Sequence, residues 1–264
     1  MSIEARHITF SYDGKRTVLD DICFSIDDGR MVCLLGPNGV GKTTLFKIIL
    51  HLLKGYQGEI LIDGDLTEGL TVKQMARRIA YIPQSHTPTF NYTVQEMILM
   101  GTTSAIAGWS APGQEQKDLA DEKMEQLGIL HLRDRGFSRI SGGERQLALI
   151  ARALVQQTKV LIMDEPTANL DYGNATVVLE QIRKLAGEGY TILQATHQPD
   201  QAFLFADEVL AVKDGKVMAQ GEPKDIITKS FIHDLYGVQV DVQSLYDDRF
   251  RVCVPISALR DMSE

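Results

Sequence analysis

Hydrophobic side chains follow two different periods along this chain. Over residues 1–30 they occupy alternate positions around turns at Asp13-Gly14 and Asp27-Asp28-Gly29, a pattern typical of half-buried strands in a hairpin. Other runs are continuously apolar, which predicts strands buried on both faces; they span residues 31–35, 160–163 and 191–195. Because a helical pattern follows each run, we predict an α/β fold with a parallel central sheet and a ligand site at the carboxyl ends of its strands.

Weaker signals place the remaining elements. Residues 59–64 read as a strand that joins the first hairpin, and Asp214-Gly215 reads as the turn of another hairpin, formed by residues 208–213 and 216–220. Between about residues 85 and 158 the strand signals fade, and helical patterns take over. These helical patterns cover residues 94–100, 114–127 and 143–157.

The elements divide the chain into parts with different roles. We predict a core of residues 1–84 and 159–222 with an antiparallel β subdomain, a helical insert at residues 85–158, and a short C-terminal extension at residues 223–264. The extension reads as a short helix followed by strand-like residues 238–242 and 250–254.

Composition narrows the class of protein. The 264 residues are 44% hydrophobic and 23% charged, ordinary values for a soluble globular protein. A net charge of −8 argues against non-specific binding to nucleic acid or to an anionic lipid surface. The N-terminus lacks the apolar core of a signal peptide, and the longest apolar stretch, residues 45–53, is too short to cross a bilayer. We therefore expect a cytoplasmic protein without a nucleic-acid partner.

The cysteines Cys23, Cys33 and Cys253 have no metal-ligand spacing and lie in apolar, strand-like runs. We expect them to be small buried hydrophobic residues in a reducing compartment, and we assign them no chemistry.

Residues 36–43 carry the strongest chemical signal. They read Gly-Pro-Asn-Gly-Val-Gly-Lys-Thr, which fits the phosphate-binding loop Gly-x-x-x-x-Gly-Lys-[Ser/Thr] in full. The glycines let backbone amides point at phosphate oxygens, Lys42 adds a positive charge for the β- and γ-phosphates, and Thr43 offers a hydroxyl to Mg²⁺. An apolar run precedes the loop and a helical pattern follows it, so the alternative of a plain glycine-rich turn is disfavoured. We predict a nucleoside triphosphate site.

An acidic pair ends the apolar run at residues 160–163. Asp164 would hold Mg²⁺ directly or through a water, and Glu165 could orient and deprotonate an attacking water. The alternative is an acidic turn that only caps the next segment.

Ser141-Gly142-Gly143 stands at the head of a predicted helix, where a hydroxyl, free amides and the helix dipole can bind an anion. On this tripeptide alone, a simple helix cap with flexible glycines is the favoured interpretation.

Taken together and in this order, the motifs resemble the ATP-binding-cassette (ABC) ATPases, over essentially the whole chain. The resemblance extends to Asp164-Glu165-Pro166 followed by Ala168-Asn169-Leu170-Asp171. It implies a P-loop NTPase fold of the ABC type, which binds ATP and Mg²⁺. It also implies an adenine-stacking role for Tyr12, a Q-loop role for Gln84, a D-loop role for Asp171 and a switch-histidine role for His197.

In this family, two ATP-binding domains pair head to tail and hold ATP between them. Each ATP lies between the phosphate loop of one domain and the signature segment of the other, which here is Ser141-Gly142-Gly143. The resemblance implies that Ser141 and Gly143 contact the γ-phosphate held by a partner copy, and that Gln84 senses Mg²⁺ and the attacking water. His197 would hold the γ-phosphate and orient Glu165.

The expected site residues fall into three sets. The catalytic residues are Glu165, His197 and Gln84, and the Mg²⁺ ligands are Thr43, Gln84 and Asp164. The nucleotide-binding residues are Tyr12, Gly36, Pro37, Asn38, Gly39, Val40, Gly41, Lys42, Thr43, Thr44, Ser141, Gly142, Gly143 and Asp171.

Some of these expected site residues also have simpler structural interpretations. Tyr12 could be a strand-end aromatic, Gln84 a surface residue and Thr196-His197 an ordinary strand-terminal pair. Two residues depart from the commonest family pattern: Val40 should present only its backbone amide, and Glu144 replaces a glutamine in the signature without putting activity in doubt.

Residues 91–101 and 169–174 resemble the ATPase subunits of iron–siderophore, haem and cobalamin importers, a pattern that some molybdate and other metal-chelate importers share. This resemblance implies a peripheral motor subunit at the cytoplasmic face of the inner membrane. Its partners would be a second copy, integral membrane permease subunits and, indirectly, an extracytoplasmic substrate-binding protein. The alternative is a cytosolic ABC ATPase that acts as an assembly or scaffold factor.

An importer needs a groove after Gln84 that receives a permease helix. Apolar material for it comes from Phe90, Tyr92, Met97, Met100, Ile106 and Trp109, although a core position is equally consistent with each.

Overall fold

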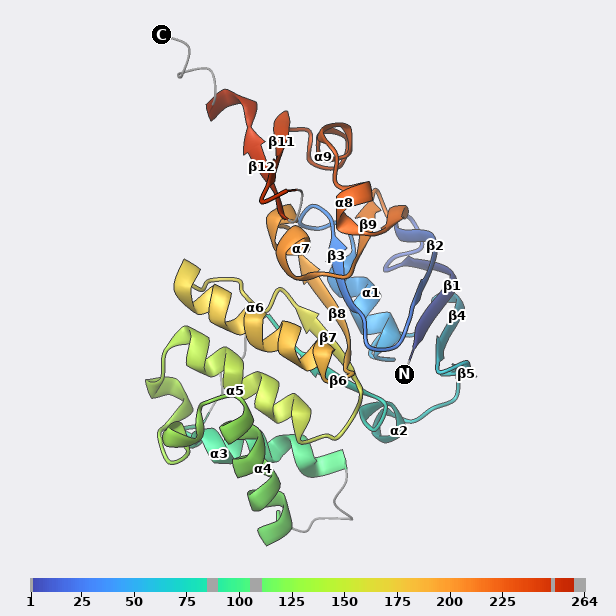
Figure 1. Ribbon diagram of the computed structural model, residues 1–264. Coiled ribbons are helices and arrows are strands. Elements are labelled where there is room, and N and C mark those ends of the chain that lie inside the picture. The colour runs from blue at the N-terminus through green and yellow to red at the C-terminus, as the bar shows by residue number, and fades with distance from the viewer. Residues whose placement is uncertain (1, 85–89, 105–110, 248–249, 259–264) are drawn as a thin grey trace. The chain divides into compact units, whose positions relative to one another are not determined.

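The computed structural model describes residues 2–84, 90–104, 111–247 and 250–258, and it divides into two compact units (Figure 1). Unit 1 comprises Met1–Glu68 and Leu193–Glu264, and unit 2 comprises Gly69–Ile192. The predicted division at residues 84, 158 and 222 stays a prediction. Among the described residues, no helix is both long enough and apolar enough to span a membrane.

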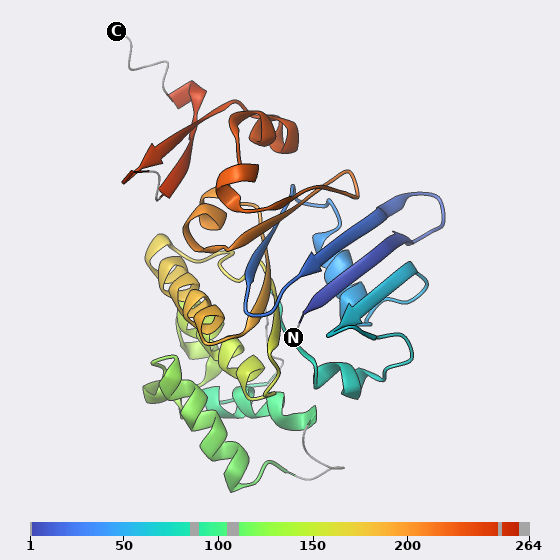
Figure 2. The ribbon, with the colours of Figure 1, turned by 45° about the vertical axis from the view of Figure 1, so that its right-hand side comes forward.

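Unit 1 contains an antiparallel sheet with the strand order β2-β1-β4-β5, whose main strands lie side by side in Figure 2. Its strands are β1 (Ile3–Ser11), β2 (Thr17–Ile26), β4 (Gln57–Ile62) and β5 (Asp65–Leu66). The predicted alternation is confirmed, because Ile22, Phe24 and Ile26 are buried on one face of β2. Cys23 lies between them on the other face and is exposed, so the prediction that it is buried is wrong.

Along the chain, the first strand of a second sheet is β3 (Met31–Leu35). All of its residues are buried, as its continuous apolar run predicted. β3 pairs in parallel with β9 (Glu208–Lys213), and β10 (Lys216–Gly221) pairs antiparallel with β9. The strand β8 (Thr191–Thr196) follows β3 in the strand order, and its last four residues belong to unit 1. Cys33 is buried at the centre of β3, as predicted.

Helices connect these strands and support them. The helix α1 (Lys42–Ile49) follows β3, and α7 (Pro199–Phe205) follows β8. Asp207, just after α7, accepts a hydrogen bond from the Met31 amide through its Oδ2 at 2.9 Å, which fixes the start of β3.

The C-terminal segment is part of the unit 1 core. It contains α8 (Pro223–Ile226), α9 (Lys229–Tyr236), β11 (Val240–Leu245), β12 (Phe250–Pro255) and a 3₁₀ turn at Ile256–Ala258. Phe231, Ile232 and Leu235 of α9 pack in one buried cluster with Leu35 of β3 and Ala211 of β9. The predicted strands are confirmed as an antiparallel hairpin, which begins at Val240 because Gly237, in a left-handed conformation, ends α9.

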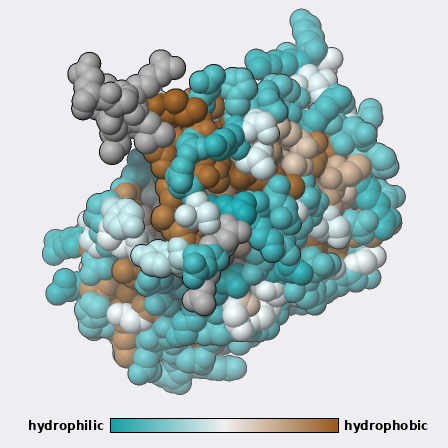
Figure 3. Space-filling view, turned by 45° about the horizontal axis from the view of Figure 1, so that its top comes forward, coloured by the Kyte–Doolittle hydropathy of each residue, from teal (hydrophilic) through white to brown (hydrophobic). Residues whose placement is uncertain are grey.

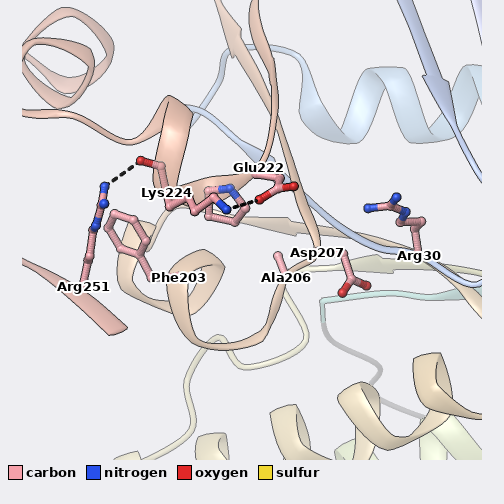
Figure 4. A pocket seen from close by; sticks show the side chains of 8 residues that line it. Arg30, Phe203, Ala206, Asp207, Glu222, Lys224 and Arg251 are labelled. Carbon is pink, nitrogen blue, oxygen red and sulfur yellow. Dashed lines mark hydrogen bonds and ion pairs between the residues drawn. The ribbon is translucent and has the colours of Figure 1, made fainter. Parts of the chain in front are cut away.

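A cavity of about 360 Å³ opens beside this segment (Figure 4). Its lining residues are Arg30, Phe203, Ala206, Asp207, Glu222, Pro223, Lys224 and Arg251. Lys224 pairs with Glu222 at 2.9 Å, and Arg251 of β12 donates to the Lys224 carbonyl at 2.6 Å. These charged groups therefore tie the C-terminal hairpin to α8.

Unit 2 combines a parallel strand pair with a layer of helices. The strand β6 (Ile79–Ile82) pairs in parallel with β7 (Val160–Asp164), with Ile79 opposite Val160 and Ile82 opposite Met163. Its α-helices are α2 (Val72–Ala76), α3 (Val94–Leu99), α4 (Gln114–Gln126), α5 (Gly142–Leu154) and α6 (Tyr172–Gly187). Short 3₁₀ turns lie at Met100–Ser104, Leu130–Leu132 and Phe137–Arg139.

The helix α5 is the centre of this layer, because it packs against α3, α4 and α6. The predicted helices at residues 94–100, 114–127 and 143–157 are confirmed as α3, α4 and α5. The last of them ends early, at Leu154, and Gln157 beyond it takes a left-handed conformation with φ 58°.

The outer surface on the face shown in Figure 3 is mostly hydrophilic, with separate hydrophobic areas. Among the described residues, the large apolar side chains that are exposed include Tyr12, Phe90, Tyr172 and Tyr246. Scattered exposure of this kind is normal for a globular protein, so no single one of these side chains marks a binding surface.

Candidate nucleotide-binding site

The loop between β3 and α1 has the backbone that a phosphate-binding loop requires. Gly39 and Gly41 take φ values of 79° and 110°, in the left-handed region that side chains disfavour. Gly36 is needed for space, because a Cβ there would lie 2.5 Å from the carbonyl oxygen of Val212 in β9. A Cβ on Gly41 would lie 2.9 Å from the Leu19 side chain. The loop is therefore held tightly against its neighbours, with α1 starting directly after it.

The lysine of this loop is folded into it. Lys42 is only 6% exposed, and its Nζ donates to the carbonyl oxygens of Gly36 at 2.6 Å and Pro37 at 3.3 Å. A positive charge thus lies inside the loop whose amides are expected to bind phosphate. Thr43 is exposed, as a hydroxyl that reaches Mg²⁺ must be, whereas Thr44 is buried.

Tyr12 stands beside the loop in unit 1. Its ring is 61% exposed and packs edge-on against Phe10, with ring centroids 4.9 Å apart. Its hydroxyl lies 3.1 Å from Thr44 Oγ1, so the aromatic ring and α1 are joined by a hydrogen bond. The sequence placed Tyr12 near the nucleotide only by family resemblance, and the bond to Thr44 was not predicted.

The acidic pair lies in unit 2, at the end of β7. Asp164 is buried, and the hydroxyl of Tyr81 in β6 donates to its Oδ2 at 3.5 Å. Burial, together with the charge of Asp164, raises the pKa of Tyr81 to about 12, so the phenol stays protonated at neutral pH. No sequence signal distinguished Tyr81 from other strand residues.

Glu165 follows Asp164 with φ 46°, an unfavourable backbone conformation for a residue with a side chain. Such strain is typically retained where the surrounding structure holds a functional group in position. The Nε2 of Gln84 lies 3.4 Å from Glu165 Oε2, so these two predicted catalytic residues are brought together within unit 2.

The signature serine begins α5. Ser141 Oγ accepts a hydrogen bond from the Glu144 amide at 3.3 Å, and Glu144 Oε2 accepts one from the Ser141 amide at 2.7 Å. This reciprocal capping box fixes the first turn of the helix. The hydrogen bond from the Ser141 amide lowers the pKa of Glu144, which keeps the carboxylate charged. Glutamate at this position therefore has a structural role of its own.

The signature contacts the D-loop inside unit 2. A Cβ on Gly143 would lie 2.5 Å from Oδ1 of Asn174, so glycine is required there. Asn174 in turn donates to Oδ2 of Asp171 at 2.6 Å, and Asp171 caps α6 by accepting from the Asn174 amide. Sequence reasoning missed the role of Asn174, although a polar residue three positions after a capping aspartate is a usable signal.

His197 follows β8 and is exposed. The preceding Thr196 is buried, donates to Gln201 in α7 at 3.0 Å and accepts from the Gln198 amide at 3.2 Å. These bonds hold the turn that carries His197.

The ABC transporter family model matches residues 19–168, more than half of the chain. The chain belongs to the ABC transporter family. The ferric enterobactin transport ATP-binding protein of Escherichia coli K12 is 34% identical over 90% of this chain and 88% of its own length. The hemin import ATP-binding protein of Bradyrhizobium diazoefficiens is 32% identical over 91% of this chain and 90% of its own length.

A transporter assigned to the metal-chelate ABC type, solved in an inward-facing conformation, aligns with a TM-score of 0.85 at 29% identity. The alignment covers 96% of this chain and 97% of that chain. The predicted ABC ATPase fold is thereby confirmed, and the protein is an ATP-binding ABC ATPase.

The side chains expected to supply apolar material for a permease groove differ in burial where the structure describes them. Met97 is fully buried, and Arg152 Nη1 lies 3.8 Å from its sulfur, so Met97 takes the core position that the sequence left open. Its place on the inner face of α3, packed against α5, makes it a core residue. Met100 and Tyr92 are half-buried, and Phe90 is 68% exposed. Ile106 and Trp109 lie outside the described residues.

Proposed function

We propose that this protein is the ATP-hydrolysing motor subunit of an importer for a metal chelate of the iron–siderophore, haem, cobalamin or molybdate type. The observation that carries the proposal is the contact between Gln84 and Glu165. It links the residue expected to activate water with the segment expected to face a permease. The named relatives, which serve ferric enterobactin transport and hemin import, support the cargo class.

In this proposal, the loop of residues 36–44 binds the phosphates of ATP, and Tyr12 stacks on the adenine. Lys42 neutralises phosphate charge, and Glu165 activates water with His197 as the orienting residue. The oxygen ligands expected from Thr43, Asp164 and Gln84 fit Mg²⁺, which prefers hard oxygen donors. When bound with ATP, Mg²⁺ would offset the charge that develops on the transferred phosphoryl group.

The active form in this proposal is a head-to-tail homodimer. Ser141 is exposed at the N-terminus of α5, where helix amides and dipole favour an anion supplied by another molecule. Ser141, Gly142 and Gly143 would contact the γ-phosphate on the partner copy, and Asp171 would approach the same interface. The dimer would dock peripherally on permease subunits at the cytoplasmic face of the inner membrane, and a substrate-binding protein would act on the outer side.

The variant Glu165→Gln tests the enzymatic part. It keeps the shape of the side chain but removes the base, so ATP hydrolysis should fall by about 10²- to 10⁴-fold while ATP binding persists. The variant should also accumulate as a nucleotide-bound dimer on size-exclusion chromatography. Turnover equal to the wild type would refute the role of Glu165.

The transport part is tested by identifying the genes that neighbour this one and reconstituting the protein with a permease found there. ATP-dependent uptake of a metal chelate into proteoliposomes, lost with Glu165→Gln, is the expected result. ATPase activity without any association with a permease would instead support the cytosolic assembly or scaffold factor.

A further inference from the structure

The hairpin of β1 and β2 contains an irregularity in each strand. The register passes from Ala5 opposite Phe24 to Ile8 opposite Ile22, and then to Phe10 opposite Leu19. One extra residue is therefore accommodated in β1 and another in β2, which is the definition of a β-bulge. His7 and Asp21 lie in these bulges and take left-handed φ values of 53° and 57°.

The bulges bring together three side chains that can bind a metal. Nδ1 of His7 lies 2.7 Å from Oδ1 of Asp21 and 3.6 Å from Sγ of Cys23. All their ligand atoms lie within 4.8 Å of one another, and all three residues are exposed. The cluster uses no residue of the phosphate-binding loop.

The distances fit a tetrahedral ion with mixed ligands. With a metal–sulfur distance of about 2.3 Å and a metal–nitrogen distance of about 2.05 Å, tetrahedral geometry places sulfur and nitrogen about 3.6 Å apart. The observed separation of Nδ1 and Sγ is 3.6 Å. Nitrogen and oxygen ligands would be about 3.3 Å apart, so the His7–Asp21 contact must widen by about 0.6 Å. Exposed side chains can make such a movement at low cost.

The backbone holds the cluster in place. Gly58 of β4 faces the bulge, and a Cβ there would lie 2.4 Å from the His7 carbonyl oxygen, so the strands approach closely at this point. The Asp21 amide donates to Thr9 Oγ1 at 3.0 Å, and the His7 amide lies 3.1 Å from Cys23 Sγ. Side chains on a fixed backbone lose less conformational entropy when they bind an ion.

The neighbouring basic residues Arg6 and Lys216 form ion pairs with carboxylates outside the cluster. Arg6 pairs with Glu4 at 2.7 Å and with Glu59 at 3.7 Å, and Lys216 pairs with Asp20 at 3.0 Å. The nearby cations are thus engaged with carboxylates other than Asp21. A thiol, an imidazole and a carboxylate on one surface match Zn²⁺ and similar thiophilic divalent ions better than Mg²⁺ or Ca²⁺, which prefer oxygen ligands only.

We propose that His7, Asp21 and Cys23 form a surface site for a thiophilic divalent transition-metal ion of the Zn²⁺ class, with water completing the coordination. The site uses none of the residues proposed for ATP hydrolysis. Because the thiol must lose its proton when the metal binds, binding should strengthen as the pH rises.

The test titrates Co²⁺, a spectroscopic substitute for Zn²⁺, into the nucleotide-free, reduced protein in the presence of excess Mg²⁺. A thiolate-to-cobalt charge-transfer band should grow to one ion per chain and disappear when Zn²⁺ is added. Such a band reports a sulfur ligand, so ions bound by the carboxylates of the ATP site do not contribute to it.

Matched variants identify the ligands. Cys23→Ser should abolish the band, whereas Cys253→Ser, which alters a thiol elsewhere in unit 1, should retain it. Loss of an outer-shell partner typically weakens metal binding 10- to 100-fold, so we expect His7→Ala and Asp21→Ala to weaken it by at least about 100-fold. ATP binding by every variant verifies the fold.

Several results would overturn the proposal. A band that persists in Cys23→Ser, or the absence of any band at saturating Co²⁺, would show that Cys23 is not a ligand. Unchanged Co²⁺ affinity in His7→Ala would show that His7 is not a ligand and would refute the three-residue site. Saturation at one ion per two chains would place the ligands on two molecules.

Discussion

The amide of Gln84 and the carboxylate of Glu165 meet at 3.4 Å in unit 2. The amide donates, so this hydrogen bond restricts the orientation of the carboxylate. The glutamate proposed as the catalytic base is therefore oriented by a residue that belongs to the segment leading toward α3. This relationship predicts how each residue responds to mutation.

Gln84→Ala should lower the rate of ATP hydrolysis roughly tenfold or more, because Glu165 loses an orienting partner and a near-attack geometry is easily disturbed. ATP affinity, measured by calorimetry, should change little. Gln126→Ala is the matched control, because Gln126 donates to Glu188 at 2.7 Å on the surface of the same unit. Equal rates in wild type and Gln84→Ala would contradict the coupling.

Lys42→Ala should weaken ATP binding roughly 10- to 100-fold, since a charge-assisted hydrogen bond to phosphate contributes about 1.5–3 kcal/mol. Lys47→Ala provides the control on the exposed side of the same helix and should bind ATP like the wild type. Isothermal titration calorimetry measures both. Wild-type affinity in Lys42→Ala would argue against a phosphate site in this loop.

Gly143→Ala should impair ATP-dependent dimerisation, because the added methyl group collides with Asn174 and displaces the D-loop aspartate bonded to it. ATP binding to the single subunit should persist. The double variant Gly143→Ala/Asn174→Ala removes the colliding amide and should recover part of the dimer on size-exclusion chromatography. Failure of this rescue, with the fold intact, would mean that Gly143 acts through another contact.

The thiols should differ in reactivity. Burial and the nearby Asp200 raise the pKa of Cys253 to about 12, and burial raises that of Cys33 to about 12. At pH 8 a thiol with such a pKa is roughly one part in ten thousand thiolate, so iodoacetamide should label the exposed Cys23 first. Mass spectrometry should show labelling of Cys253 only as the pH rises toward 12 or after unfolding. Labelling of Cys253 at pH 8 at the rate of Cys23 would contradict this assignment.

The sequence correctly predicted those elements whose local residue pattern allows only one structural interpretation. The continuous apolar run of β3 can only be buried, and the spacing of the phosphate loop leaves few alternatives to its backbone. The hairpin at residues 208–220 followed from the turn residues Asp214-Gly215 between apolar runs. Each of these depends on local chemistry that a single segment carries by itself. Residues 238–242 and 250–254 were predicted only as strand-like, and their pairing as a hairpin was found in the structure.

The sequence failed to predict burial and packing where these depend on contacts between residues distant in sequence. Cys23 looked buried because it lies among apolar residues, but a bulge and strand alternation turn it outward. The sequence left Met97 open between a groove and the core, because apolar residues at a surface and in a core have the same composition. The contact of Gly143 with Asn174 depends on the packing of α5 against α6, which no local pattern reports.

The capping box at Ser141 has a consequence for assembly. Its hydroxyl oxygen accepts the Glu144 amide, and a serine hydroxyl that accepts one hydrogen bond still has a hydrogen to donate. Helix capping and the proposed phosphate recognition would therefore use opposite ends of the same O–H group and would not compete. In the proposed dimer, a partner molecule carrying ATP would meet a recognition element that is already folded. The entropy lost on dimerisation would then come from joining the two molecules and not from ordering this loop.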